Sequence, residues 1–423
     1  MPDLRTDAID VINALRRAGH VAYLAGGCVR DELLGDDPKD YDVATSAAPP
    51  AVIEVFGERR TQAVGQAFGV MLVKSGQSQI EVATFRRDAD YADGRRPDSV
   101  VFTNAEEDAR RRDFTINGLF KDPLDEDQII DHVGGRRDLE ARLIRAIGAA
   151  EQRFGEDYLR LLRAVRFAAR LGFDIEPGTW EAIKLHAPRL ARISPERIAD
   201  EMRRMLIAPT RGQAWQLLWD SGLLEVVLRT LPIDIPPRPA RTDVMDYVAQ
   251  LDRPVSFALA IAAMLVQVHR SAGWTSRRLF EPHHIDTSVR AARAALRLSN
   301  EDTDALSAVL RIGTTLHDDP ATDARLMRFL ASDHADDART LLAAMASDEA
   351  TADRHAQLTA RLKSLEATDY RQPPKVTGAD LIAAGLEPGP AFKTALDEAY
   401  DAQLEARATA KDELLQIAID ASK

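Results

Sequence analysis

The sequence has very little cysteine: Cys28 is the only one among 423 residues. A lone cysteine excludes an intramolecular disulfide and a zinc site built from cysteine pairs. We therefore expect a reducing compartment and place the protein in the cytoplasm. The start of the chain agrees with this, because Leu4 to Ala18 is a polar, helix-like segment that does not resemble a signal peptide.

Long apolar runs and an excess of basic charge are also missing. No stretch approaches the ~20 consecutive apolar residues of a membrane span, so we expect no membrane partner. Lys and Arg number 55 against 67 Asp and Glu, a net charge of −12, whereas nucleic-acid-binding proteins usually carry the opposite balance. The arginines are nevertheless clustered, so a basic cleft inside an acidic protein is compatible with the composition. The clusters lie at Arg86-Arg87, Arg95-Arg96, Arg110 to Arg112 and between Arg160 and Arg170.

The most informative stretch covers residues 23–45 and reads YLAGGCVRDELLGDDPKDYDVAT. The apolar run Val21 to Ala25 predicts a buried strand, and Gly26-Gly27 predicts a turn that glycine enters most cheaply. Cys28 to Leu34 has helical character and ends at Gly35, a typical residue after a helix end. The segment therefore predicts a strand, a glycine turn and a short helix.

Two acids follow that helix. Lys39 to Val43 has the alternation of a strand, which would place Asp40 and Asp42 on one side and Tyr41 on the other. Two carboxylates so close repel each other unless a cation lies between them, and Mg²⁺ is the usual one. The alternative is a pair of ordinary surface acids.

The glycine turn adds a phosphate site to this pair. Gly27 opens the helix, so a phosphate can approach backbone N–H groups at the positive helix end, and Arg30 could bind another phosphate oxygen. A phosphate site beside a metal-binding carboxylate pair is what nucleotidyl transfer by two metal ions requires.

The combined pattern GG-x-V-R-D-x-L-L-G…K-D-x-D resembles the signature of polymerase-β-type nucleotidyltransferases that act on RNA 3′ ends. These are the class II tRNA nucleotidyltransferases (CCA-adding enzymes) and bacterial poly(A) polymerases. The resemblance implies an α+β fold, with a catalytic head of mixed sheet and helices followed by an all-α neck, body and tail. We expect these at residues 1–147, 148–210, 211–370 and 371–423.

Two further features of the expected head fit the resemblance. Such enzymes use a third carboxylate on a neighbouring strand, and Glu81 in the predicted strand Gln79 to Phe85 is a candidate for it or a solvated strand residue. The charged segment Thr84 to Phe102 is predicted as a loop and looks like the flexible loop of CCA-adding enzymes. The string RRDFTIN resembles another family signature, which assigns Arg112 to triphosphate contact and makes Asp113 a structural or active-site acid.

Within a second informative stretch, Arg153 to Phe173, the apolar residues from Leu159 to Leu171 predict a strong helix. Asp157 and Arg160 would be neighbours on its surface, either as a salt bridge or as an acceptor and donors that mimic the edge of a base. The string ED-x-x-R-x-x-R-A-x-R-F is similar to the amino-acid template of class II CCA-adding enzymes, which implies the second role. Arg163 and Arg166 would then face phosphate or RNA.

The rest of the chain carries weaker signals. Pro373 to Leu396 looks like the tail of bacterial tRNA nucleotidyltransferases, although a plain pair of helices fits as well. His317-Asp318 resembles the His-Asp pair of metal phosphohydrolases, but His269 lacks a following Asp and no further ligand set is evident.

The resemblance implies template-independent addition of CCA to tRNA, from CTP and ATP, with Mg²⁺ held by Asp40 and Asp42. Addition of only A or only CC, poly(A) synthesis, and an inactive RNA-binding protein remain open alternatives. The sequence does not give the oligomeric state.

Overall fold

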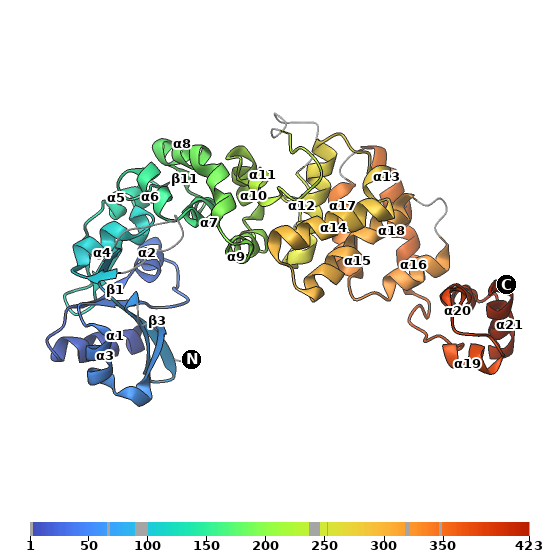
Figure 1. The fold of residues 1–423 in the computed structure, drawn as a ribbon, viewed down its shortest axis with the longest axis horizontal. Helices are drawn as coiled ribbons and strands as arrows, with labels where there is room; N and C mark the ends of the chain where they lie inside the picture. The colour runs from blue at the N-terminus through green and yellow to red at the C-terminus, as the bar shows by residue number, and fades with distance from the viewer. Residues whose placement is uncertain are drawn as a thin grey trace. The chain divides into compact units, whose positions relative to one another are not determined.

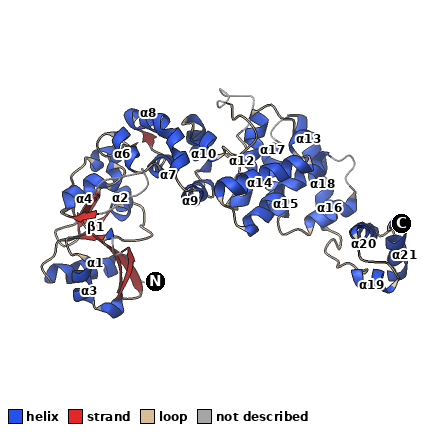
Figure 2. Ribbon diagram, viewed as in Figure 1, coloured by secondary structure: helices blue, strands red, loops and turns tan. Residues whose placement is uncertain are grey.

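The computed structural model describes residues 3–65, 68–88, 100–236, 246–251, 253–317, 322–346 and 349–422. The chain forms two compact units, residues 1–227 and 228–423 (Figure 1). Among the described residues, strands occur only in the first unit, whereas helices make up most of both (Figure 2). The predicted fold class, an α+β head followed by a helical remainder, is confirmed.

A seven-stranded mixed sheet forms the centre of the head. Its strand order is β3-β4-β5-β2-β1-β8-β9, in which β2 and β5 are parallel and the other neighbours antiparallel. The strands are β1 (Ala22–Ala25), β2 (Val43–Thr45), β3 (Thr61–Gly65), β4 (Val70–Ser75), β5 (Ser78–Thr84), β8 (Leu119–Asp122) and β9 (Gln128–Asp131). Because β1, β2 and β5 are adjacent, residues at their ends meet in one place.

Helices α1 (Leu4–Arg17) and α3 (Pro49–Phe56) pack against this sheet (Figure 1). Helix α1 buries Ala8, Val11, Ile12 and Leu15, the spacing of one helical face. Burial of each larger apolar side chain contributes roughly 1.5–3 kcal/mol. The helices thereby fix the sheet whose other side carries the polar residues described below.

The segment predicted as a loop between Thr84 and Phe102 is only partly described, and residues 89–99 lie outside the described residues. Its ends are not loop but a two-stranded hairpin, β6 (Arg86–Asp88) and β7 (Val100–Phe102). Charge and the lack of apolar alternation hid these strands, because their pairing partner is the other end of the same segment.

The remainder of the first unit is mainly helical. Its helices are α2 (Gly27–Leu34), α4 (Ala105–Arg111), α5 (Gly135–Glu140), α6 (Ala150–Glu156), α7 (Leu159–Leu171), α8 (Pro177–His186), α9 (Pro195–Leu206), α10 (Arg211–Asp220) and α11 (Leu223–Val227). A short parallel pair, β10 (Leu143–Ile144) and β11 (Asp174–Ile175), is the exception to an all-helical neck. Helix α7 contacts α9 and α10 and buries most of its apolar residues.

The strong helix predicted from the apolar residues Leu159 to Leu171 is confirmed as α7, but the expectation that Asp157 lies on the same helix is wrong. Helix α6 ends at Glu156, and Asp157 has extended backbone angles, φ −149° and ψ 105°. Helix α7 then begins at Leu159, whose N–H donates to the Asp157 carboxylate at 3.0 Å. Asp157 ends α6 because its side chain caps α7, although the apolar pattern of the sequence continues through this position.

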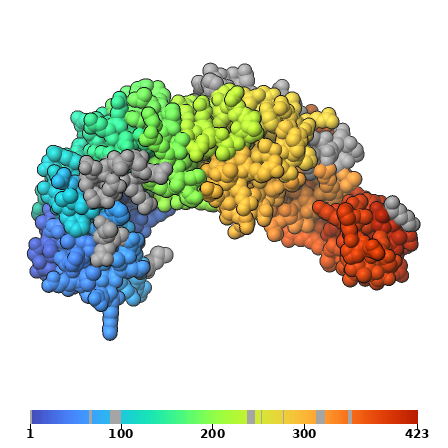
Figure 3. Space-filling view, in the orientation of Figure 1, coloured from blue at the N-terminus to red at the C-terminus, as the bar shows by residue number. Residues whose placement is uncertain are grey.

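The second unit consists of helices. They are α12 (Phe257–Ser271), α13 (Ser276–Leu279), α14 (Pro282–Leu296), α15 (Asn300–His317), α16 (Asp323–Leu330), α17 (Ala335–Met345), α18 (Glu349–Glu366), α19 (Gly378–Ala383), α20 (Pro390–Leu404) and α21 (Lys411–Ala421). Helix α19 starts with the expected cap, in which the side chains of Thr377 and Asp380 each bond the other residue's backbone. The last three helices bury a small core of their own and form one compact cluster, red in Figure 3.

The predicted domain boundaries at residues 147, 210 and 370 stay a prediction, since packing separates the chain only after Val227. Within the part of the chain that the structure describes, no helix has both the length and the apolar character needed to cross a bilayer.

Candidate active site

All of the site residues predicted from the sequence line one pocket in the first unit. The pocket has a volume of 760 Å³ and opens between the sheet, helix α2 and helix α7. Its lining includes the predicted acids and the predicted phosphate- and base-binding residues: Asp40, Asp42, Glu81, Gly27, Arg30, Arg112, Asp157, Arg160, Arg163 and Arg166. Acidic and basic groups therefore face the same space.

The acidic side of the pocket comes from the ends of two neighbouring strands. Asp40 and Asp42 precede β2 and do not lie in a strand, which corrects the expected strand over Lys39 to Val43. The β1 ladder reaches Asp42, whose carbonyl accepts from the Ala25 N–H at 3.0 Å, and goes no further. Glu81 lies in β5, where the flanking residues are buried in the sheet core and the acid faces the pocket.

The acids repel one another. Burial, followed by the charges of Glu81 and Asp40, raises the pKa of Asp42 to about 7. Burial, and then the charge of Asp40, also raises the pKa of Glu81. None of the three carboxylates forms an ion pair with a described residue within 4.0 Å.

This donor set fits a divalent cation. Carboxylate oxygens are the ligands that Mg²⁺ prefers, and a cation bound beside Asp40 and Asp42 would reduce the repulsion that contributes to the raised pKa of Asp42. The ligand oxygens of Asp40, Asp42 and Glu81 do not all lie within 4.8 Å of one another. Whether Glu81 is a direct ligand stays a prediction.

The glycine turn forms the opposite wall of the pocket. Gly26 has φ +76° and precedes α2, and a Cβ at this position would lie 2.7 Å from Arg112 Nη1. Arg112 in turn donates to the Asn117 carbonyl at 3.2 Å and to Asp108 at 3.1 Å. At Gly27 a Cβ would meet nothing closer than 3.8 Å. The position that requires glycine is therefore Gly26, which the sequence did not separate from its neighbour.

Arg30 is more deeply buried than a phosphate-binding arginine at a surface. It is 2% exposed, and its guanidinium donates to Asp31 Oδ1 at 2.6 and 2.8 Å and to Asn117 Oδ1 at 2.6 Å. These bonds join α2 to the turn after Asp113. In this arrangement Arg30 holds the pocket wall, and its direct contact with phosphate stays a prediction.

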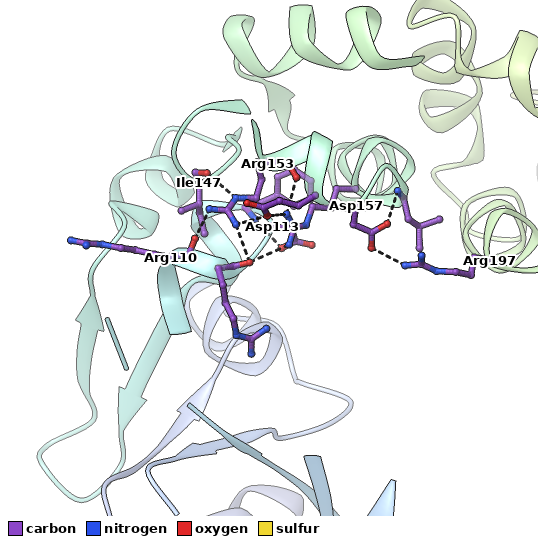
Figure 4. A network of polar contacts seen from close by, with 11 residues as sticks. Arg110, Asp113, Ile147, Arg153, Asp157 and Arg197 are labelled. Carbon is purple, nitrogen blue, oxygen red and sulfur yellow. Dashed lines mark hydrogen bonds and ion pairs between the residues drawn. The ribbon is translucent and has the colours of Figure 1, made fainter. Parts of the chain in front are cut away.

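The side chains of Asp157 and Arg160, which were expected to be neighbours, do not contact each other. Asp157 accepts from Arg197 Nη2 of helix α9 at 2.7 Å (Figure 4). Arg160 instead donates to Glu156 and to the backbone carbonyls of Arg153 and Arg111. The break between α6 and α7 separates the two side chains, so the predicted surface neighbours are wrong as a contact, although both line the pocket.

The two arginines one and two turns further along α7 are also neutralised within the protein. Arg163 pairs with Asp113 at 2.7 Å and Arg166 with Glu201 at 2.6 Å. Burial alone would raise the pKa of Asp113, but Arg163 and Asn117 outweigh it and hold the pKa at about 2. Glu201 was missed from the sequence, because an acid on a helical face gives no sign that its partner lies on another helix.

Arg153 is a second residue that sequence reasoning missed. Its guanidinium donates to the carbonyls of Arg110 at 2.6 Å, Arg111 at 3.2 Å and Ile147 at 3.1 Å (Figure 4). It thereby joins α6 to the end of α4, next to Arg112. The only signal in the sequence is its place just before the template-like string.

Comparison with known proteins supports this geometry. Residues 22–145 match the family model "Poly A polymerase head domain", and residues 172–233 match "Probable RNA and SrmB-binding site of polymerase A". A solved structure of the Bacillus stearothermophilus CCA-adding enzyme in complex with CTP is 30% identical, with a TM-score of 0.74, over 99% of this chain and 98% of that one. The chain belongs to the family of class II tRNA nucleotidyltransferases and bacterial poly(A) polymerases.

Curated members of this nucleotidyltransferase family are similar over about half of the chain. The CCA-adding enzyme of Lactobacillus johnsonii is 45% identical over 228 residues, 54% of this chain and 56% of that protein. That of Geobacillus stearothermophilus is 45% identical over 218 residues, 51% and 53% of the two chains. The match thus spans about half the length of these curated relatives.

A second group of potential metal ligands belongs to the second unit. Glu281, His283 and His284 at the start of α14 have ligand atoms within 4.8 Å of one another. This group is not the predicted His317-Asp318 pair, of which Asp318 lies outside the described residues. It shares no residue with the pocket.

Proposed function

We propose that this protein adds CCA to the 3′ ends of tRNA by nucleotidyl transfer from CTP and ATP without a nucleic-acid template. The observation that carries the proposal is that one pocket is lined by three carboxylates, none of them in an ion pair with a described residue, by a glycine turn and by an arginine-rich wall. The named CTP complex and the curated CCA-adding enzymes support the same choice of substrates.

The residues divide the work as follows. Asp40 and Asp42, with Glu81 beside them, would hold Mg²⁺, which when bound activates the RNA 3′-hydroxyl and neutralises the triphosphate. Gly26 and Gly27 line the pocket, so the N–H groups at the start of α2 would bind phosphate oxygens there. Arg112 stands against this turn and adds positive charge where the triphosphate would lie.

Base selection is assigned to Asp157 and Arg160. Their side chains are each fixed by other residues of the protein, Asp157 by Arg197 and Arg160 by Glu156. A carboxylate acceptor and guanidinium donors held in this way can distinguish the hydrogen-bonding edges of cytosine and adenine. The rigid mounting matters because a mobile pair would accept either base.

The tRNA, a cytoplasmic location and a tRNA contact by α19–α21 are part of the same proposal. The tail-like segment and the acidic composition favour tRNA processing over poly(A) synthesis. Full CCA addition is favoured over CC addition because residues 86–97, which resemble the flexible loop, are present in the sequence. An inactive RNA-binding protein is disfavoured because both metal-binding acids are present.

The test uses purified protein and tRNA transcripts that end at the discriminator base or at CC. We expect CTP alone to add two residues, ATP alone to extend only the CC-ending transcript, and both together to complete CCA and stop. Addition of A only, of C only, or of long A tracts would each replace the proposal by the corresponding alternative. No incorporation with either transcript would favour the alternative that the protein is an inactive RNA-binding protein.

A further inference from the structure

The two predicted metal-binding acids lie in a segment that has no regular structure. Eight residues connect the end of α2 at Leu34 to the start of β2 at Val43. Within residues 37–41, all of which are described, we find one hydrogen bond, and it comes from the Tyr41 hydroxyl. The backbone that carries Asp40 and Asp42 is therefore not fixed by strand pairing on both of its sides.

Tyr41 separates the two acids and points away from them. Its ring is 7% exposed and belongs to the head core, together with Cys28 of α2 and Val43 of β2. Its hydroxyl donates to Glu32 Oε1 at 2.9 Å.

Glu32 is itself held by two cations. Arg5 Nε of α1 donates to Oε1 at 2.9 Å and Lys121 Nζ of β8 donates to Oε2 at 2.6 Å. Its side chain is 14% exposed. Burial alone would raise the pKa of Glu32, but the bonds from Lys121, Tyr41 and Arg5 lower it, so the group is an ionised acceptor.

Glu32 also belongs to helix α2, whose first turn forms the phosphate wall of the pocket. A bond from Tyr41 to Glu32 therefore fixes the acid-bearing segment to the element that would bind the triphosphate. We propose that Tyr41 and Glu32 form an anchor that positions Asp40 and Asp42 relative to α2 and so sets the affinity for the divalent cation. Tyr41 is a positioning residue, and this inference rests on the proposed function.

The test measures binding of Mn²⁺ to the full chain without nucleotide, from the free-ion signal in electron paramagnetic resonance. Tyr41→Phe keeps the ring in the core and removes the donor. Partners that orient metal ligands usually contribute 10–100-fold to affinity, and because Tyr41 acts on the segment and not on a carboxylate, we expect a loss of about tenfold. In the incorporation assay the KM for Mg²⁺ should rise similarly, while kcat at saturating Mg²⁺ stays within about twofold.

The matched control is Tyr23→Phe. Tyr23 is a second tyrosine of the head, half-buried and packed against Phe85 and Phe120, and its hydroxyl makes no hydrogen bond with a described residue. It should bind Mn²⁺ as the unmodified protein does. Glu32→Ala and the double variant complete a thermodynamic cycle. Because Tyr41 acts through Glu32, the double variant should bind Mn²⁺ about as tightly as whichever single variant binds it less tightly.

Three results would overturn the anchor: unchanged Mn²⁺ binding in Tyr41→Phe, an equal loss in Tyr23→Phe, or full additivity in the double variant. Thermal denaturation of each variant shows whether the head is folded. If Glu32→Ala does not fold, the comparison of Tyr41→Phe with the unmodified protein decides the question. If the unmodified protein neither binds Mn²⁺ nor incorporates nucleotide, the proposed function fails instead, which separates the two outcomes.

Discussion

The raised pKa of Asp42 predicts that this acid costs the head stability when no cation is bound. A pKa of about 7 in place of 3.8 corresponds to about 4 kcal/mol at 1.36 kcal/mol per pKa unit. Asp42 keeps some contact with solvent, which screens the repulsion, so we expect about half of this, ~2 kcal/mol. Asp42→Asn should therefore stabilise the metal-free protein at pH 8 while abolishing incorporation.

The sign of the pH dependence follows from the proton balance. The unfolded chain loses the Asp42 proton near pH 3.8 and the folded head keeps it until about pH 7, so this group's contribution to stability falls as the pH rises between these values. The advantage of Asp42→Asn should accordingly be largest at pH 8 and fall to less than half at pH 4.5.

The assay is thermal denaturation in EDTA at both pH values, following the transition of the first unit. An increase of ~2 kcal/mol corresponds to roughly 4–8 °C for a unit of this size. Added Mg²⁺ should stabilise the unmodified protein and not the variant. A variant that is less stable than the unmodified protein at pH 8, or a difference that does not change with pH, would refute the reasoning.

Three further predictions concern other walls of the pocket. Asp157→Ala should blur the choice between CTP and ATP more than it lowers total transfer, and single-nucleotide incorporation rates measure this; an equal loss with preserved choice would contradict the template role. Asp113→Asn should lower the free energy of unfolding by about 2 kcal/mol at pH 7, because the low pKa of Asp113, about 2, means that its ionised form stabilises the folded state. This stabilisation is present above pH 4 and is lost as the pH falls toward 2. Equal denaturation midpoints at pH 7 would contradict the prediction. Gly26→Ala should raise the KM for CTP more than Gly27→Ala does, because only the first has a positive φ and displaces a neighbouring arginine; equal effects would show that the turn tolerates a Cβ at both positions.

Local chemistry made several elements predictable from the sequence. Pro49 to Phe56 forms a helix, since the prolines suit its first turn. Helix α2 ends before Gly35, which has the left-handed conformation expected of a glycine there, φ +80°. Ser194 precedes α9 and Pro195 opens it, as serine before a helix and proline in its first turn favour. In each case residues within one turn of the helix end decide the structure.

Features that depend on distant residues were not predictable. The apolar period runs through Asp157, so nothing nearby shows the helix break, and its partner Arg197 lies 40 residues away. Arginines 163 and 166 were assigned to phosphate or RNA because isolated basic residues suggest such ligands, whereas buried Asp113 and Glu201 pair with them in the fold. The strand alternation around Tyr41 gave the right faces for Asp40 and Asp42 but the wrong element, since tertiary anchoring replaces the ladder there.

The central claim is that Asp40 and Asp42 hold the divalent cation beside the glycine turn. Crystals grown with Mn²⁺ and CTP, with anomalous differences collected to locate the ion, test it most directly. The account predicts a peak at roughly 2 Å from both carboxylates, between them and the triphosphate. A peak only at the Glu281, His283 and His284 group, or a triphosphate bound while the two acids point apart, would contradict it.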